Sequence, residues 1–340
     1  MVRNSQIIMR DENERIGIVL VNLGTPDAPE SGALRRYLRE FLSDPRVVEA
    51  PRWVWWLALN LVILRVRPAK SARNYRKIWT AQGSPLLVYT RNLTQKIHAQ
   101  FAAQYGKNVV IKMAMRYGSP HLATVLSELH RQGVSRLLIL PLFPQYSATT
   151  AGSIYDCVAD QLRTWRNLPH LRIIGDYYQD ERYIAALADT IRQRWAQGVP
   201  PRKLLFSFHG IPQRYADQGD PYPEQCRRTA SAVAIQLGLN DGQWYMAFQS
   251  RFGRETWLQP YADKVLAAWA ADGVESVSVV CPGFAVDCLE TIEEIAEENA
   301  AVFKKGGGKT FDYIPALNDT AAHVEVLSQL VRNTIGDWLN

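Results

Sequence analysis

Four short apolar runs, each followed closely by proline, limit the fold of this chain more than any other feature of its sequence. Stretches with the spacing of amphipathic helices lie between the runs. Short β-branched strands that alternate with helices are typical of a parallel sheet covered by helices on both faces. The runs span residues 16–22, 136–140, 203–208 and 277–280, and the prolines that follow them are Pro26, Pro141, Pro212 and Pro282.

The same runs indicate an internal duplication. Residues 21–26 (VNLGTP) resemble residues 207–212 (SFHGIP), and residues 125–143 resemble residues 265–284. We therefore predict an α/β fold of two similar Rossmann-like domains, each a parallel sheet covered by helices. The first domain is expected over residues 16–165 and the second over 171–315, with a helix at 320–338 that packs back on the first. Ligands of such sheets bind beyond the carboxyl ends of the strands, so a cleft is expected there.

The first half carries an insertion. Pro26 and Pro141 are 115 positions apart, whereas Pro212 and Pro282 are 70 positions apart, so the first half has about 45 extra residues. They include an apolar lip, at about residues 46–80, in which eleven of the twelve residues from Trp53 to Leu64 are apolar. This run is too short to cross a bilayer, which takes about twenty residues.

Basic residues surround the apolar run. The stretch from Arg46 to Lys77 carries eight basic residues and one acidic residue, a charge of +7, and the whole chain carries +6. The rest of the chain therefore sums to 6 − 7 = −1, which argues against nucleic-acid binding. Tryptophans beside arginines are typical of a surface that lies in a membrane interface, although a buried core helix would also be apolar. We expect peripheral membrane contact through the lip.

Two further features concern the compartment. The first fifteen residues are polar and charged and lack the apolar core of a signal peptide, so we expect a loose tail on a cytoplasmic protein, placed peripherally on the inner face of the membrane. The four cysteines are scattered and form no CxxC pair, which argues for reduced thiols and against a disulfide framework or a structural zinc site.

One histidine and one acidic stretch have the chemistry of a site. His209 directly follows a strand, where its imidazole could titrate near neutral pH or bind a metal. Asp287, Glu290, Glu294 and Glu297 or Glu298 recur every three or four residues, so they would share one face of a helix. The helix dipole favours acidic residues in the first turn, here Asp287 and Glu290. It does not account for Glu294, Glu297 and Glu298 in the later turns. A row of carboxylates that leads to a histidine suits the movement of a divalent cation or of protons.

At these residues the chain resembles the ferrochelatases. Residues 207–212 (SFHGIP) together with 281–295 (CPGFAVDCLETIEEI) are similar to the paired signature of that family. The similarity runs in order from about residue 16 to residue 320. The other matching blocks are residues 21–26, 75–78, 83–85, 114–117, 142–147, 249–251 and 257–258.

The resemblance implies a fold of two Rossmann-like domains with a porphyrin cleft between them. It also implies a lyase that inserts Fe2+ into protoporphyrin IX and releases two protons, the last step of haem synthesis. The catalytic residues would be His209 and Glu290, with Asp287 and Glu294 as further residues on the path of the metal. The residues expected to bind the porphyrin are Leu23, Arg67, Lys70, Arg116, Tyr117, Tyr146, Gln249 and Trp257.

Within this set, the basic side chains of Arg67, Lys70 and Arg116 are expected to receive propionates. The sequence leaves open whether His209 accepts a proton or binds the iron.

No cofactor is expected, because Fe2+ is a substrate. Some members of the family hold an iron–sulfur cluster, but here the last cysteine, Cys288, lies 52 positions before the end, and Ala148 stands in the place of an internal ligand. Cys288 stands where animal members carry a second histidine. Three alternatives stay open at this point: a coproporphyrin ferrochelatase, a sirohydrochlorin-type chelatase, and a non-catalytic carrier of haem or metal.

Overall fold

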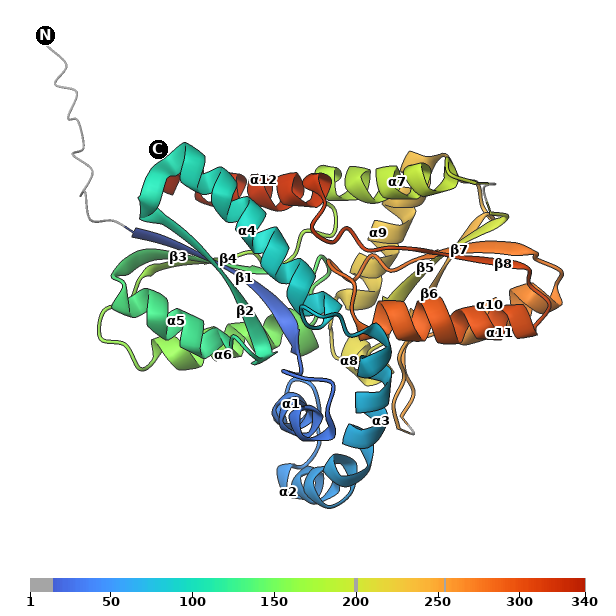
Figure 1. The fold of residues 1–340 in the computed structure, drawn as a ribbon, viewed down its shortest axis with the longest axis horizontal. Helices are drawn as coiled ribbons and strands as arrows, with labels where there is room; N and C mark the ends of the chain where they lie inside the picture. Colours follow the sequence, from blue (N-terminus) through green and yellow to red (C-terminus); the bar gives the residue numbers. More distant parts are fainter. Residues whose placement is uncertain (1–14, 199–200, 254, 340) are drawn as a thin grey trace, which may run out of the picture.

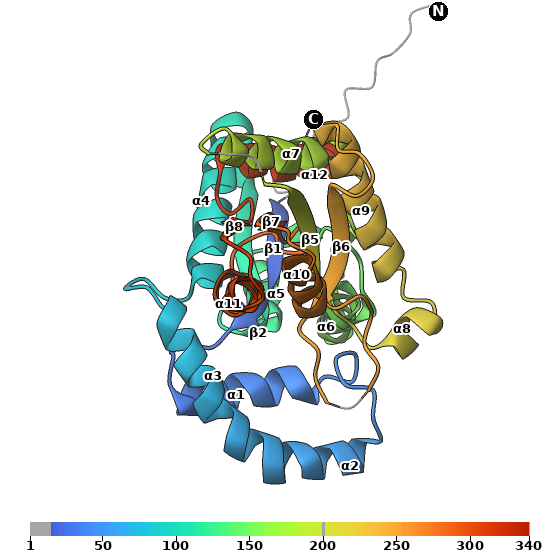
Figure 2. The same ribbon diagram turned by 90° about the vertical axis from the view of Figure 1, so that its right-hand side faces the viewer.

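The structure of the protein is a computed structural model, and it describes residues 15–198, 201–253 and 255–339. The loose tail expected before Arg15 lies outside the described residues. The chain is arranged as two sheets side by side, each covered by helices, with a helical lobe that projects from the first half (Figure 1). Turning the molecule shows the same lobe below both sheets (Figure 2).

The first sheet is parallel and has the strand order β2-β1-β3-β4. β1 is central, and its successive residues Ile18 and Val19, which point to opposite faces of the sheet, are both completely inaccessible to solvent. This explains why β1 reads as a continuous apolar run rather than an alternating one. The strands are β1 (Arg15–Thr25), β2 (Val109–Gly118), β3 (Val134–Pro141) and β4 (His170–Ile173).

The second sheet repeats the arrangement, with the parallel order β6-β5-β7-β8. Its central strand β5 ends at His209, which is in register with Gln249 of β6. Two parallel sheets with corresponding strand orders confirm the predicted fold class. The strands are β5 (Lys203–His209), β6 (Trp244–Gln249), β7 (Ser276–Val280) and β8 (Thr310–Ile314).

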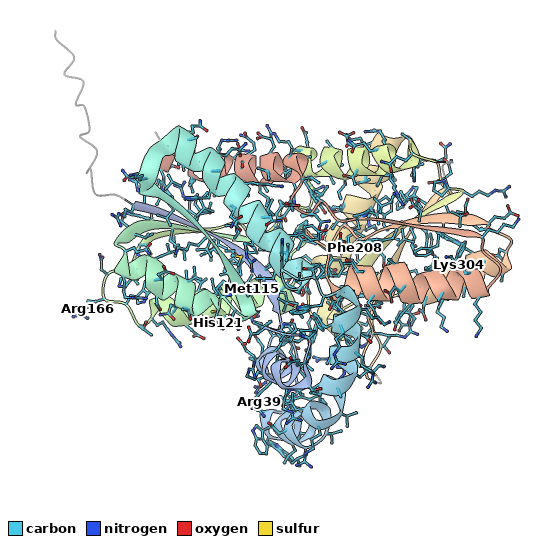
Figure 3. The ribbon with its side chains drawn as sticks, viewed as in Figure 1. Arg39, Met115, His121, Arg166, Phe208 and Lys304 are labelled. Carbon is cyan, nitrogen blue, oxygen red and sulfur yellow. The ribbon has the colours of Figure 1, made fainter. Side chains whose placement is uncertain are left out.

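Helices cover both faces of each sheet, and their apolar sides form the core. Figure 3 shows Met115 and Phe208 in the interior, whereas Arg39, Arg166 and Lys304 lie at the surface. The helices of the first half are α4 (Pro85–Tyr105), α5 (Leu122–Arg131) and α6 (Ser153–Leu162), with short turns η2 (Gly106–Asn108) and η3 (Ala148–Gly152). Those of the second half are α7 (Glu181–Trp195), α8 (Gln213–Asp217), α9 (Tyr222–Leu237), α10 (Ala262–Ala271), η4 (Glu290–Asn299) and α11 (Ala300–Lys305).

The last helix, α12 (Ala321–Leu339), lies beside α4 and α7 (Figure 1). Ser328 Oγ donates a hydrogen bond to Gln100 Oε1 of α4 at 2.7 Å, and Arg172 of β4 pairs with Asp337. The helix follows the last strand of the second half in the chain, but it packs on the first half.

The lobe below the sheets consists of α1 (Ser31–Ser43), α2 (Arg52–Leu57), η1 (Ala58–Ile63) and α3 (Leu64–Ile78). Pro68 lies inside α3 and cannot donate to the carbonyl of Leu64, four residues earlier. Arg35 Nε of α1 donates to that carbonyl instead, at 3.0 Å. The π-helical turn η1 directly precedes this point, so the apolar run is divided into two short helical segments.

Most of the apolar run lies at the surface, and only Leu59 and Leu64 of it are buried, in a small cluster with Leu42. Trp53 is 73% exposed, Trp56 60% and Val62 59%. The alternative of a buried core helix is therefore excluded. Across the described ranges, no helix is both long enough and apolar enough to span a bilayer.

Candidate functional site

The end of β5 places His209 at the edge of the second sheet. Its ring Nδ1 lies 2.6 Å from the carbonyl oxygen of Gly210. A carbonyl can only accept, so Nδ1 carries the proton and the lone pair of the neutral ring is on Nε2. Nothing in the described part of the chain hydrogen-bonds to Nε2, which leaves this nitrogen available to accept a proton or bind a metal.

Two aromatic side chains flank the imidazole. The rings of Trp257 and Phe284 each have their centroids 6.5 Å from that of His209. The Trp257 indole donates to the carbonyl of Phe252 at 2.8 Å, which fixes its ring. A Cβ on Gly210 would lie 3.3 Å from the Trp257 ring and 3.0 Å from the Gln249 carbonyl, so a larger residue would push against this wall.

Gln249 connects His209 to the acidic helix. Its side chain is buried, and its Oε1 accepts a hydrogen bond from Ser207 Oγ at 2.8 Å. Its Nε2 donates to the backbone carbonyl of Glu290 at 2.9 Å. Because Gln249 lies beside His209 in the sheet, this bond brings the start of η4 next to the imidazole.

Glu294 lies on the side of η4 that faces this strand end. Its carboxylate accepts a hydrogen bond from the Ser250 backbone N–H at 2.7 Å and another from the Ser250 hydroxyl. Burial raises the pKa of Glu294, and the hydrogen bonds from Ser250 and the charge of His209 only partly oppose that rise. The register of His209 with Gln249 and the bond from Gln249 to the Glu290 carbonyl place the imidazole near the start of η4, in keeping with the charge of His209 acting on this pKa.

Glu290 approaches two tyrosines of the first half. Tyr37 of α1 and Tyr75 of α3 are buried, and burial together with the nearby charge of Glu290 raises the pKa of both phenols. Both phenols therefore stay protonated. Glu290 is thus placed where the two halves meet.

The predicted row of acidic residues does not continue to Glu297. η4 is a π-helix, in which the hydrogen bonds join residues five apart. Glu293 and Glu297 lie together on Lys77 of α3, at 2.9 and 3.2 Å from its Nζ. Glu297 therefore belongs to a different face from Glu294.

Asp287 lies before the helix and is buried. Its carboxylate accepts hydrogen bonds from the Tyr313 and Thr291 hydroxyls, from the Ala316 N–H, and from Asn318 Nδ2 at 2.7 Å. These donors occupy both carboxylate oxygens and fasten the turn that begins η4 to the end of β8.

The predicted porphyrin-binding residues of the first half are more widely separated than the residues around His209. Leu23 is half-buried at the end of β1, where Gly24 has a φ of +126° and a Cβ would meet the Tyr117 carbonyl at 1.8 Å. Arg116 and Tyr117, at the end of β2, bind Asp44 rather than the residues around His209. Tyr146 follows β3, and its backbone N–H donates to Gln225 of the second half at 2.7 Å.

The two basic residues of the lip that were predicted to bind the porphyrin lie near the second half. The guanidinium of Arg67 lies 4.5 Å from the centre of the Phe252 ring, and burial lowers the pKa of Arg67. Lys70 is exposed, and its charge lowers the pKa of Glu298, although burial has the larger, opposite effect. Both side chains therefore lie on the side of the lip that faces the acidic helix and the Trp257 loop.

Several residues of the site were not singled out from the sequence. Ser250 and Tyr75 lie in blocks that match the family, so the sequence marked these positions. It did not predict what the two side chains contact. Phe284 is in the matched signature as well. Lys77 lies in the matched block 75–78 together with Tyr75. Tyr37 had no sequence signal, because the charge that acts on it belongs to Glu290, more than 200 positions away.

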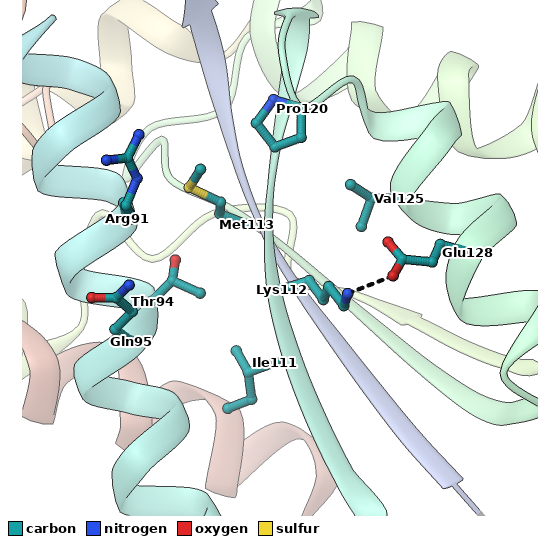
Figure 4. A pocket seen from close by; sticks show the side chains of 9 residues that line it. All are labelled: Arg91, Thr94, Gln95, Ile111, Lys112, Met113, Pro120, Val125 and Glu128. Carbon is teal, nitrogen blue, oxygen red and sulfur yellow. Dashed lines mark hydrogen bonds and ion pairs between the residues drawn. The ribbon is translucent and has the colours of Figure 1, made fainter. Parts of the chain in front are cut away.

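An open groove of about 340 Å³ lies elsewhere, along the edge of β2 between α4 and α5 (Figure 4). Lys112 and Glu128 pair across it at 2.8 Å. None of its lining residues belongs to the site around His209. Among the described residues, no three His, Cys, Asp or Glu side chains form a group that could hold a metal ion.

Comparison with solved structures supports the fold. SirB from Bacillus subtilis, solved with Fe3+, superposes with a TM-score of 0.55 at 13% identity, covering 94% of this chain and 95% of that one. The sirohydrochlorin chelatase SirB from Bacillus subtilis subspecies spizizenii, in complex with cobalt, superposes with a TM-score of 0.52 at 11% identity, covering 94% and 95%. The two-domain Rossmann-like fold of this chain is thus that of the metal chelatases.

Sequence comparison gives the family. Residues 15–335 match the family model Ferrochelatase. The ferrochelatase of Nitrosococcus oceani is 52% identical over 96% of this chain and 89% of its own length, and that of Alcanivorax borkumensis is 50% identical over 96% and 95%. The chain belongs to the ferrochelatase family, the lyases that insert iron into a porphyrin.

Proposed function

We propose that this chain inserts Fe2+ into protoporphyrin IX and forms protohaem with release of two protons. The observation that carries the proposal is the convergence of His209, with its free Nε2, and Glu290 and Glu294 around the buried Gln249. Metallation needs a base for the two pyrrole N–H groups and oxygen ligands that deliver a divalent cation. The site offers both kinds of group next to each other.

His209 is the proton acceptor in this proposal. Its Nδ1–H is engaged with the Gly210 carbonyl, so Nε2 is the nitrogen that takes a pyrrole proton. Glu290 and Glu294 bind the incoming Fe2+ through carboxylate oxygens, which suit this cation. Asp287 fixes the start of η4, and with it Glu290, through the hydrogen bonds that it accepts from Thr291 and Asn318.

The walls hold the ring. Leu23, Trp257 and Phe284 supply apolar and aromatic surface for a flat macrocycle, and binding energy from such walls can distort the ring toward the metallated shape. Arg67 and Lys70 lie on the inner side of the lip, where they can pair with propionates. Gln249 keeps the base and the carboxylates at a fixed separation.

The test is an anaerobic assay of the purified protein with protoporphyrin IX and Fe2+, followed through the loss of porphyrin fluorescence. Catalytic loss over many turnovers supports the proposal. Loss that stops at one equivalent would indicate a carrier instead. A parallel reaction with coproporphyrin decides the substrate, since faster turnover of that tetracarboxylate would overturn the choice of protoporphyrin. A reaction with sirohydrochlorin tests the remaining alternative in the same way.

The exposed apolar face of the lip supports a peripheral contact with the inner face of the membrane. Trp53 and Trp56 are exposed among apolar neighbours, and Arg52 and Arg65 beside them can meet anionic headgroups. Vesicles of phosphatidylcholine with phosphatidylglycerol should sediment the protein, and the variant with Trp53→Ser and Trp56→Ser should stay in the supernatant. Equal binding of both proteins would contradict this contact. Leu168→Ser, at an exposed apolar position outside the lip, is the matched control.

We also propose that the enzyme works without an iron–sulfur cluster. All four cysteines are buried, and Ala148 stands at the position of the internal ligand in cluster-containing members. Iron analysis and visible absorption of the anaerobically purified protein test this directly. A cluster spectrum would refute it.

A further inference from the structure

Asp44 is a buried carboxylate at the junction between α1 and the lip. Its side chain is only 5% exposed, and one of its oxygens, Oδ2, accepts three hydrogen bonds. The donors are Arg116 Nη2 at 2.7 Å, the Tyr117 hydroxyl at 2.8 Å and Ser153 Oγ at 2.6 Å. We call these four residues the Asp44 cluster. Its members come from three elements that are distant in the sequence.

The cluster is charged and tightly held. Burial alone would raise the pKa of Asp44, but hydrogen bonds from Ser153, from the Arg46 N–H and from Tyr117, with the charge of Arg116, lower it overall. The carboxylate is therefore ionised at neutral pH. Arg116 is held from a second side as well, because its Nε donates to the Ser153 carbonyl at 3.0 Å and to Ser153 Oγ at 2.7 Å.

A row of packed aromatic rings leads from the cluster to the site. Tyr117 contacts Phe41 edge to face with ring centroids 5.1 Å apart, and Phe41 stacks on Tyr37 at 6.1 Å. The Tyr37 hydroxyl donates to the Gly24 carbonyl at 3.2 Å, directly after Leu23. Tyr37 is also one of the two phenols whose pKa the charge of Glu290 raises, after burial. Asp44 thus fixes the wall of the first half that faces Glu290.

We propose that Asp44 is a positioning residue for porphyrin binding, which acts by fixing Arg116, Tyr117 and the aromatic row that ends at Tyr37, beside the backbone that carries Leu23. Asp44 itself does not touch the substrate. The inference rests on the proposed function, because it assumes that the porphyrin binds against this wall. A wall that is displaced should weaken binding of the ring but leave the proton acceptor and the metal-binding carboxylates of the second half intact.

The first experiment is the steady-state kinetics of Asp44→Asn with protoporphyrin IX and Fe2+. Asn keeps an acceptor oxygen for the hydroxyls but removes the charge that holds Arg116. We expect the KM for porphyrin to rise about tenfold, with kcat and the KM for Fe2+ within about twofold of the wild type. Asp156→Asn is the matched control, since Asp156 pairs with the neighbouring Arg46 at the surface, and it should leave all three constants unchanged.

A double-mutant cycle shows whether Asp44 acts through Arg116. In the background of Arg116→Met, Asp44→Asn should raise the porphyrin KM by less than about twofold, because the partner is already lost. A merely structural role would instead lower kcat through loss of folded enzyme at an unchanged KM, and that result overturns the proposal. An equal rise in KM in both backgrounds also overturns it.

Ser153→Ala is a second, milder test of the Asp44 cluster, which applies if Asp44→Asn does not fold. It removes a single hydroxyl from the cluster, and a rise in porphyrin KM of about threefold is expected. An unchanged KM in a folded Ser153→Ala protein counts against the proposal. Absence of turnover by the wild type would refute the proposed function, whereas wild-type turnover with an unaltered Asp44→Asn variant would refute only the role of Asp44.

Discussion

The central strands of the two sheets end in the same place but present different chemistry. β5 ends at His209 beside Gln249, and the last residues of β1 include Leu23 and Gly24, of which Gly24 lies beside Tyr117. Each strand is the second in a sheet of corresponding order. One end offers an imidazole, an amide and a nearby acidic helix, and the other offers an apolar side chain next to the glycine whose carbonyl accepts from Tyr37. A duplicated scaffold can therefore give one half the reacting groups and the other half the wall that holds the ring.

Replacing the residue at each strand end tests this division directly. His209→Ala should lower kcat about thousandfold, because it removes the proposed base, and it should leave the porphyrin KM nearly unchanged. Leu23→Ala should raise the porphyrin KM about tenfold at nearly constant kcat, because it removes apolar contact made in both the ground state and the transition state. The measurement is steady-state kinetics at saturating Fe2+.

The control for both variants is thermal unfolding followed by circular dichroism, which should show folded protein. A similar loss of kcat in the two variants would contradict the division between a reacting half and a binding half. Wild-type turnover by His209→Ala would refute the assignment of the base.

The framework could be predicted because each strand and its following turn are encoded locally. The four apolar runs found in the sequence are β1, β3, β5 and β7, the two central strands of each sheet. Their partners β2, β4, β6 and β8 were not singled out as strands. β4 and β8 are short and only partly buried, so their apolar pattern is weak.

The acidic stretch was predicted as an α-helix, whereas the structure has the π-helix η4, in which Glu297 contacts Lys77 and lies away from Glu294. The Glu290 carbonyl is bound by Gln249, and the Glu294 carbonyl by Asn299 Nδ2 at 2.8 Å. In both places a side chain donates to a carbonyl of the helix, and the periodicity of the sequence does not show such contacts. The Asp44 cluster was missed for a related reason, since Asp44 and Ser153 are 109 positions apart and meet only in the fold.

His323 makes the same kind of hydrogen bond as His209, from its ring Nδ1 to a backbone carbonyl, but it lies in the core and not at a strand end. His323 of α12 also has its Nδ1 2.6 Å from a backbone carbonyl, that of Asn318, but its ring is completely buried. Burial lowers the pKa of His323 from 6.5 to about 4. Between these two pH values the unfolded chain binds more protons than the folded one. The free energy of unfolding should therefore fall by about 3 kcal/mol as the pH drops from 6.5 to 4.

Urea unfolding at several pH values measures this effect. His323→Gln should be less stable at pH 7 and should show a flatter dependence on pH over the same window. His98→Gln, at an exposed position of α4, is the control and should keep the wild-type slope. If the slope of His323→Gln equals that of the wild type, His323 is not the group that titrates.

A substitution at Gln249 should impair the reacting half less than the loss of His209 does. Gln249→Met keeps the length of the side chain but removes the hydrogen bonds to Ser207 and to the Glu290 carbonyl. We expect kcat to fall about tenfold, because the carboxylates lose their fixed separation from His209. Steady-state kinetics with Gln236→Met as the exposed control checks this. A rise in porphyrin KM at full kcat would place Gln249 among the binding residues instead.

The smallest expected effect concerns the contact that joins the halves through the lip. Lys77 of α3 is the cation beside Glu293, whose side chain is only 5% exposed, and beside the exposed Glu297. Lys77→Met should lower Tm by roughly 3 °C, because the Glu293 carboxylate stays buried without a cation. Adding Glu293→Gln should recover part of that loss, since it removes the unpaired charge. Lys309→Met breaks a pair with Glu275 that is exposed on both sides, and it should leave Tm unchanged. An equal fall in Tm for Lys77→Met and Lys309→Met would mean that the lip is held to the second half by its apolar packing and not by this ion pair.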